Sequence, residues 1–243
     1  MLNSYKADLH IHTCLSPCTE LDMSPQAIAE QASQQKIDIL GICDHNSAEN
    51  VPALIEAAKR YAIRVLPGME VTSQEEVHIL ALFDDLEPAL ELQDIVYRHL
   101  PGENDEEAFG MQVVVNAEGE VLGFNSKLLI GASTLSIEEV TAHIKALDGL
   151  AVAAHIDRQG FSLLGQLGFI PPELPLDALE ISPRTTFAKA QAEYNPRLPL
   201  TCSSDAHTVP DIGTGYTTFL LKDRSTGEIK KALRGEEGRR IIH

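Results

Sequence analysis

Residues 36–43 read KIDILGIC, an apolar run with the length and composition of a buried β-strand, and the polar residues Asp44, His45 and Asn46 follow it directly. Six other apolar runs of strand length occur along the chain, and helical patterns separate several of them. These runs cover residues 5–11, 63–71, 76–83, 149–156, 176–182 and 198–204. Strands that alternate with helices form parallel sheets or barrels, so the sequence predicts an α/β fold with seven strands.

Serine residues mark the beginnings of the predicted helices. Ser24 precedes Pro25, which is a favoured residue at the first helical position. Ser136 and Ser225 are each followed three residues later by a glutamate, which is the spacing of a capping box. Together with Ser47, they predict helices over residues 24–35, 47–61, 136–148 and 225–234.

The alternation of strands and helices is interrupted between residues 84 and 135. This stretch contains an acidic helical pattern (LEPALELQDIVYRHL), an acidic loop (PGENDEEAFG) and a hairpin pattern (QVVVNAEGEVLGF) with Glu118 and Gly119 in its turn. The sequence contains no repeat and no obvious linker. We therefore expect a single domain over residues 1–243, with an insertion at about 84–135.

The composition restricts the partners that this chain is expected to bind. Lysine and arginine total 19, against 36 aspartate and glutamate residues, which gives a formal net charge of −17. Basic surfaces bind nucleic-acid backbones and anionic membranes, so we expect no general nucleic-acid binding and no membrane partner. The chain has no apolar run long enough to span a membrane, no signal-peptide pattern and only four cysteines. These features predict a soluble, cytoplasmic protein with reduced thiols and leave its oligomeric state open.

Six of the nine histidines lie in short polar clusters that close the apolar runs. His10 and His12 in DLHIHT are two residues apart, so both side chains point to the same face of a strand. Asp205 and His207 have the same spacing. Taken singly, each residue has an ordinary structural explanation: His78 could be a core histidine bonded to the backbone, and Asp205 could cap a helix.

The joint placement of these residues favours a metal site. Residues beyond the carboxyl ends of parallel strands converge on one face, where burial of many unpaired polar groups would be very unfavourable. Coordination of metal ions removes that difficulty. The mixed imidazole and carboxylate set exceeds the needs of one ion and suits two or three divalent ions of zinc, manganese or iron. The eight candidate ligands are His10, His12, His45, Glu70, His78, His155, Asp205 and His207.

The motifs DLHIHT, GICDHN, GMEV, EVHILAL, AAHIDR and CSSDAH resemble, in order and spacing, those of the PHP family, named for polymerase and histidinol phosphatase. The resemblance spans about residues 7–207. It implies a distorted seven-stranded (β/α)7 barrel, a trinuclear metal site at the carboxyl ends of the strands, and hydrolysis of phosphoesters. The eight candidate ligands fall on the ligand positions of the family.

One position departs from the family pattern. The family usually has an acidic residue or a histidine shortly after the HxH motif, where this chain reads CLSPC. Pro17 cannot bind a metal, whereas Cys18 as a thiolate, or Asp22, could replace the missing ligand. The alternative is that Cys14 and Cys18 only pack within the fold.

We therefore predict a phosphoesterase that hydrolyses a small-molecule phosphate ester, favouring a monoester, with a metal-activated hydroxide at a di- or trinuclear site. Arg158 follows His155 by three residues and Arg184 follows the strand run at 176–182, so both are candidates for binding the phosphate. Asp44 is the candidate catalytic residue, which either protonates the leaving group or orients a ligand.

Other interpretations stay open at this point. Amidohydrolase-type metallohydrolases also begin with an HxH pair, but they usually carry a bridging carboxylated lysine, for which the predicted strands have no obvious residue. A non-catalytic or regulatory metal-binding domain would use the same ligands. A separate cysteine zinc site is disfavoured because the sequence has no CxxC pair.

Overall fold

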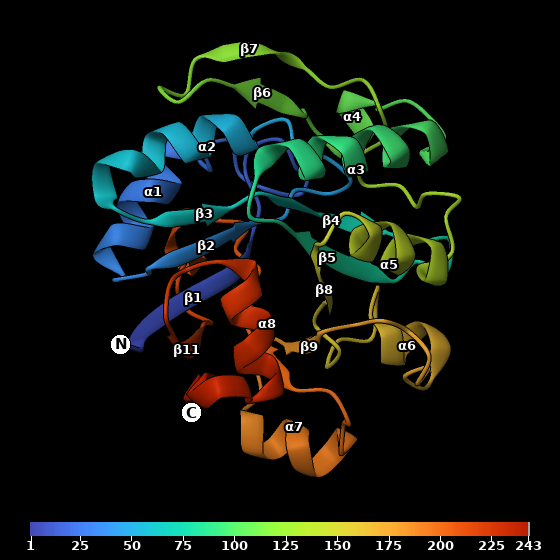
Figure 1. Cartoon of the computed structure of the whole chain (residues 1–243). Coiled ribbons are helices and arrows are strands. Elements are labelled where there is room, and N and C mark those ends of the chain that lie inside the picture. Colours follow the sequence, from blue (N-terminus) through green and yellow to red (C-terminus); the bar gives the residue numbers. More distant parts are fainter. Residues whose placement is uncertain (243) are drawn as a thin grey trace.

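The computed structural model describes residues 1–242 and contains two five-stranded sheets with helices around them (Figure 1). In the first sheet, β1, β2 and β3 are parallel, and β11 is antiparallel to both β1 and β12. The spatial order of the strands is β12 (Arg240–Ile242), β11 (Thr217–Leu221), β1 (Asn3–Ile11), β2 (Ile39–Ile42) and β3 (Arg64–Leu66).

The second sheet carries the strands from the middle of the chain. Its spatial order is β10 (Leu200–Cys202), β9 (Ala178–Ile181), β8 (Leu150–Ala153), β5 (His78–Leu82) and β4 (Gly68–Thr72). β8, β9 and β10 are parallel, whereas β5 is antiparallel to both of its neighbours. Only five residues connect β4 to β5, too few for the crossover that parallel strands need, so β5 must run in the opposite direction.

The predicted run at 63–71 forms two strands that belong to different sheets. Pro67 separates them: β3 pairs with β2, and β4 pairs with β5. Proline lacks the N–H group that a continuous ladder would need at this position. The prediction of seven strands is therefore wrong in number, and it also omitted β11 and β12 near the C-terminus.

Two isolated parallel bridges, Ile11 with Ala206 and His45 with Glu70, join the two sheets. Within residues 1–242, strand pairing between the sheets extends no further than these bridges. The α/β class is confirmed, but a closed seven-stranded (β/α)7 barrel is not. Apolar residues from both sheets, such as Leu9 and Leu80, share one buried cluster, so the sheets also pack against each other.

Helices surround the sheets, and the serine caps are as predicted. Ser24 and Ser225 each accept a hydrogen bond from a first-turn N–H, and Ser136 with Glu139 forms a complete capping box. The helix expected from Ser47 begins later, at Val51, and the Ser47 hydroxyl contacts Gln93 and Tyr97 as well as the Glu49 N–H. The α-helices are α1 (Pro25–Gln34), α2 (Val51–Ala58), α3 (Leu86–His99), α4 (Glu106–Phe109), α5 (Ile137–Ala146), α6 (Leu163–Leu167), α7 (Phe187–Tyr194) and α8 (Thr226–Arg234). Short 3-10 turns cover Lys59–Tyr61, Val209–Asp211 and Glu236–Gly238.

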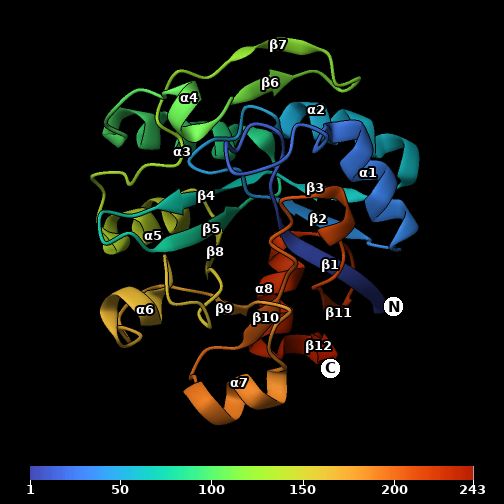
Figure 2. The ribbon, with the colours of Figure 1, turned by 180° about the vertical axis from the view of Figure 1, so that it is seen from behind.

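The stretch 84–135 contains the predicted helix, α3, and the predicted hairpin, formed by β6 (Val113–Val115) and β7 (Val121–Phe124). Gly119 has a φ of 81°, which allows the tight turn between the two strands. The hairpin lies beyond α3 on the outside of the molecule in both views (Figure 1 and Figure 2). A single domain over 1–243 with an insertion here stays a prediction, and its last residue lies outside the described part.

No helix in the described residues 1–242 is long and apolar enough to cross a membrane. All four cysteines are unpaired. Cys14, Cys43 and Cys202 are buried, and only Cys18 is exposed.

Candidate metal centre

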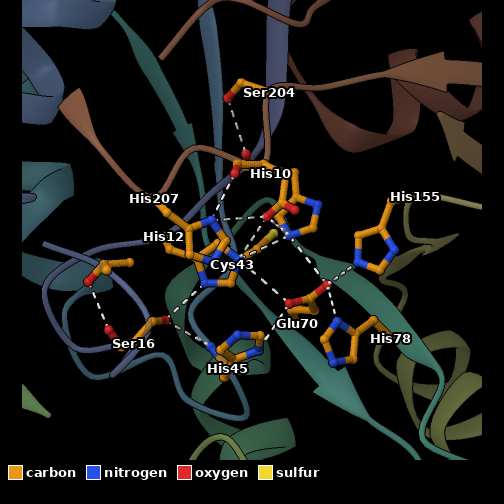
Figure 3. Close-up of polar contacts among 12 residues, drawn as sticks. His10, His12, Ser16, Cys43, His45, Glu70, His78, His155, Ser204 and His207 are labelled. Atoms are coloured by element: carbon orange, nitrogen blue, oxygen red, sulfur yellow. Dashed lines mark hydrogen bonds and ion pairs between the residues drawn. The ribbon is translucent and has the colours of Figure 1, made fainter. Parts of the chain in front are cut away.

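The Glu70 carboxylate lies at the centre of a group of imidazoles (Figure 3). Glu70 is in the middle of β4 and is 1% exposed. Its two oxygens lie 2.8 Å from His78 Nδ1, 3.0 Å from His45 Nδ1, 3.3 Å from His155 Nε2, 3.4 Å from His10 Nε2 and 3.5 Å from His12 Nε2. Five of the predicted ligands therefore surround a sixth.

The remaining two predicted ligands join the same group. Asp205 Oδ1 lies 3.2 Å from Nε2 of both His10 and His12. The His207 ring centroid is 4.4 Å from that of His12. All eight candidate ligands are thus brought together by the fold, although they are spread over almost 200 positions of the sequence.

Strand direction explains why these side chains meet. β1, β2, β4, β8 and β10 all run in the same direction. Their ligands lie at or beyond the carboxyl ends of these strands, except Glu70, which lies in the middle of β4. His78 was predicted to lie within a strand, and it is the first residue of β5, which is antiparallel to β4 and β8. Because β5 runs the opposite way, its beginning lies at the edge where the other strands end.

Several backbone conformations in the cluster are uncommon for residues other than glycine. φ is 31° at His155, 51° at Asp205 and 52° at Asn46. Such conformations cost free energy and persist where the surroundings enforce them, as they often do at functional sites. A hydrogen bond from the Ser204 N–H to the buried Asp8 carboxylate (2.9 Å) fixes the backbone next to Asp205.

The ring orientation of His10 and His12 is set by hydrogen bonds on the side away from the cluster. His10 Nδ1 lies 2.9 Å from Glu180 Oε1, and His12 Nδ1 lies 2.9 Å from Ser16 Oγ. Ser16 donates its hydroxyl proton to Asp44 (2.7 Å), so it accepts from the N–H of His12. These bonds hold a proton on Nδ1 of both rings and direct Nε2 into the cluster, where a cation would bind.

Asp44 was predicted either to protonate the leaving group or to orient a ligand, and its contacts favour the second role. Its carboxylate is fully buried and accepts from the Thr13 N–H and hydroxyl (both 2.7 Å) as well as from Ser16. All three bonds point into the loop after β1 rather than into a cavity. Asp44 therefore positions that loop and, through Ser16, the ring of His12.

The predicted phosphate-binding arginines lie at the entrance to the cluster. Arg158 Nη1 is 2.5 Å from Asp205 Oδ2. A cavity of about 480 Å³ is lined by both Arg158 and the exposed Arg184, together with Cys18, Asp205 and His207. A second cavity of about 360 Å³ contains Arg158 but not Arg184. Both arginines therefore adjoin the cluster, and Arg158 borders both cavities.

In the cluster, burial and the neighbouring charges act in opposite directions on the pKa values of the two carboxylates. Burial alone would raise the pKa of Glu70, but His78 and His10 hold it well below its usual value. Burial alone would likewise raise the pKa of Asp205, and His10 and His12 lower it. Both carboxylates are thus ionised near neutral pH, as metal ligands must be.

The donor set fits metal ions rather than a purely hydrogen-bonded network. Although they lie close together, Nδ1 of His45, Nδ1 of His78 and Oε1 of Glu70 are buried and form no hydrogen bond of acceptable geometry among the described residues. Such orphaned atoms are costly unless something binds them. Ligand atoms within 4.8 Å of one another form three sets, namely His10–His12–Asp205, His45–Glu70–His78 and His12–Cys18–His45–His207.

Cys18 and Asp22 were left as alternatives for the missing ligand, and the structure separates them. Cys18 belongs to the third set, whereas Asp22 is exposed and belongs to none of the sets found among the described residues. Cys14 does pack, with its thiol directed at the carbonyl of Val113 (3.8 Å).

Glu180 and Ser16 were missed by the sequence analysis. Glu180 is 1% exposed within the apolar strand β9, and a lone acidic residue inside a buried run could have signalled a special role. Ser16 carries no such signal, because serine is common in loops. Its role depends on contact with Asp44, 28 residues away.

Metal binding should depend steeply on pH. Burial alone would lower the pKa of His45, but its interactions with Cys18 and Glu70 raise it to about 10. In the metal-free protein its charge adds stability that is complete below pH 6.5 and is lost as the pH rises through 10. A cation must displace this proton, so affinity should rise about tenfold per pH unit for each proton displaced. Calorimetric zinc titrations in buffers of different ionisation enthalpy measure that release, and binding without it would contradict the assignment of His45.

Known proteins match this chain over most of its length. A sequence profile of the PHP domain matches residues 8–158, and a profile described as PHP-associated matches residues 193–237. Together the two segments include all eight candidate ligands. The PHP profile alone covers more than half of the chain.

Individual relatives include nucleases. A 5′-3′ exoribonuclease of Haemophilus influenzae is 30% identical over 89 residues, which are 35% of this chain and 31% of that protein. The uncharacterized protein YqxK of Bacillus subtilis is 26% identical over 258 aligned positions, covering 97% of this chain and 63% of that protein. The lesion-specific endonuclease Q of Pyrococcus furiosus has a TM-score of 0.72 at 22% identity, over 99% of this chain and 58% of that chain. The matched segments thus cover between 31% and 63% of the length of these relatives.

These relatives contradict the expectation that nucleic acid is excluded as a partner. One structure of endonuclease Q, with a TM-score of 0.70, is a complex with a 27-mer duplex substrate. The expectation used the net charge of the whole chain, whereas binding depends on the local field, which metal ions in the site would reverse. The matching profile, the shared fold and the ligand cluster agree, and the chain belongs to the PHP domain family.

Proposed function

We propose that this chain is a metal-dependent phosphoesterase with a di- or trinuclear centre. The observation that carries the proposal is the buried Glu70 carboxylate, surrounded by five imidazoles at 2.8–3.5 Å and accompanied by the ionised Asp205. When bound, divalent zinc, manganese or iron would lower the pKa of a water toward neutrality and stabilise charge on the phosphate. The three ligand sets described above would hold the ions.

The protein's own groups would orient the ligands and the substrate. Glu180 and Ser16 hold His10 and His12 with Nε2 directed into the cluster. Arg158 is paired with Asp205, so occupation of that carboxylate by a cation would release the guanidinium for a phosphate oxygen. Arg184 borders the larger cavity, where it could reach a second oxygen.

The substrate that we propose is a phosphate ester that ends in an accessible phosphate, either a nucleotide or the end of a short nucleic-acid strand. Cavities of about 480 and 360 Å³ have the size of sites for small molecules. Two or three divalent ions would add about +4 to +6 of local charge, which offsets the acidic surface. A small phosphate monoester without a base is the second candidate, because the larger cavity is polar and carries both arginines.

Phosphate release from a broad panel of esters tests the proposed activity. The panel should include nucleoside monophosphates, sugar phosphates, a phosphodiester and 5′-phosphorylated oligonucleotides. The protein is loaded with zinc, manganese or iron(II), and a chelated sample is the control. Metal-dependent release is the expected result. Folded, metal-loaded protein that releases no phosphate but binds metal tightly would favour a regulatory metal-binding domain, and cleavage of amides or lactones instead would favour an amidohydrolase.

We further propose that Cys18 is a ligand of the third set, with His12, His45 and His207. Thiolates bind zinc and iron well, and a thiolate replaces the acidic residue or histidine of the family pattern. Cobalt(II)-loaded protein should show a near-ultraviolet sulfur-to-cobalt charge-transfer band. Cys18→Ser should lose the band and about one metal equivalent, whereas Cys18→Asp should lose the band but keep the ion. The buried Cys14→Ser variant is the matched control, and an unchanged band in Cys18→Ser would exclude the thiolate.

A further inference from the structure

The smaller cavity over the metal cluster has two apolar residues in its wall, Phe161 and Ile130. Its floor is formed by ligand residues that include Glu70, His78 and His155. The Phe161 ring stacks on the His78 ring with centroids 4.8 Å apart and an angle of 21° between the planes. Phe161 is nevertheless 45% exposed, so part of its surface remains open beside the metal cluster.

The position of Phe161 is enforced by the backbone around it. Its carbonyl accepts a hydrogen bond from the His78 N–H (2.9 Å), which ties the loop to the beginning of β5. Its φ of 56° is unfavourable for a bulky aromatic residue. Immediately afterwards Ser162 caps α6 by accepting from the Gly165 N–H (2.9 Å). The ring is therefore presented at the cavity rather than buried in the core.

Ile130 is also held in place, by Asn46, which follows β2 in the sequence. The amide nitrogen of Asn46 donates to the carbonyls of both neighbours of Ile130, Leu129 and Gly131, at 2.8 Å each. Asn46 Oδ1 accepts from the Thr72 N–H (3.0 Å) in β4. The stretch 84–135 thus contributes an apolar side chain to the cavity, and a fully buried asparagine fixes its place.

We propose that Phe161 and Ile130 form an apolar clamp for a nucleobase whose phosphate is bound at the metal centre. The proposal rests on the phosphoesterase function proposed above and specifies its substrate as a nucleoside phosphate. A base that stacks on the open part of Phe161 would contact Ile130, while Arg158, which borders both cavities, faces the phosphate. Stacking on an aromatic ring tolerates any base, so the clamp selects for a base without selecting among bases.

Two variants and two substrates test the clamp by kinetics. Phe161→Ala should raise KM for AMP about tenfold and leave KM for ribose 5-phosphate within about twofold, because only AMP carries a base to stack. Ile130→Ala should act in the same direction. Phe169→Ala, which removes an exposed phenylalanine that does not line the cavity, is the matched control. Equal changes of KM for both substrates would overturn the clamp.

A binding measurement keeps this inference separate from the proposed activity. The chain has no tryptophan, so Phe161→Trp creates a single fluorescent reporter at the clamp. In zinc-loaded protein its emission should be quenched by the non-hydrolysable methylene phosphonate analogue of AMP and not by methylphosphonate. Quenching without release of phosphate from any ester would retain the clamp and reject the phosphoesterase. Turnover of esters without quenching by the nucleotide analogue would retain the phosphoesterase and reject the clamp.

Discussion

Replacement of Glu70 by glutamine is expected to lower kcat for phosphate esters by about 1,000-fold or more and to remove at least one bound metal ion, since loss of about 4 kcal/mol of transition-state stabilisation corresponds to that factor. The amide keeps the shape of the side chain but not its charge. It would also place an N–H₂ donor against imidazole nitrogens that now lie 2.8–3.5 Å from a carboxylate. The remaining ligands could not hold the same number of cations.

Without metal, the same substitution should lower the free energy of unfolding by about 3 kcal/mol at pH 7, because the buried imidazolium of His45 loses its acidic partner. Metal content is measured by elemental analysis, turnover by phosphate release and stability by chemical denaturation. Glu118→Gln, at an exposed position of the hairpin turn, is the matched control and should change none of them. Full metal content and normal turnover in Glu70→Gln would remove Glu70 from the proposed centre.

Replacement of Asp44 by alanine should have the second largest effect, acting on stability and on metal affinity together. The fully buried carboxylate accepts three hydrogen bonds from Thr13 and Ser16, and its loss leaves these donors unpaired. We expect the free energy of unfolding to fall by about 3 kcal/mol. Because Ser16 orients His12, metal affinity should fall by about 10- to 100-fold, the usual effect of removing a residue that holds a ligand.

The pH profile distinguishes positioning by Asp44 from the catalytic role first predicted for it. A general acid imposes a limb on the pH dependence of kcat, and that limb disappears when the acid is removed. For a positioning residue, the limb stays and saturating metal restores most of the turnover. Asp44→Asn, which can still accept one of the bonds from Thr13, should lie between wild type and Asp44→Ala. Loss of a limb at saturating metal would return Asp44 to the catalytic residues.

The cluster of candidate ligands was the most predictable part of this protein. Residue type restricts which side chains can bind a cation, and a period of two along a strand places His10 and His12 on one face whatever the rest of the chain does. The helix caps at Ser24, Ser136 and Ser225 were predictable for a similar reason, since a capping bond connects residues only three positions apart.

The strand arrangement was less predictable, because pairing depends on distant parts of the chain. The apolar run at 63–71 is uniform in sequence, yet Pro67 divides it between two sheets. Because β5 is antiparallel to β4, the side chain that joins the cluster, His78, is the first residue of its strand rather than the last. The composition of the whole chain was the poorest guide, since a net charge of −17 says little about the field at one site.

The sequence by itself determined the α/β class, the helix starts and the identity of the eight candidate ligands, because these depend on residue type and short-range spacing. Only the tertiary structure decided that Asp44 acts through Ser16 and that Glu180 holds His10. It also decided that Asn46 fixes Ile130 in the wall of the cavity that Phe161 lines. Each of these assignments requires a contact between residues separated by 28 to 170 positions. Such contacts are set by how the sheets and loops pack, and no local pattern encodes them.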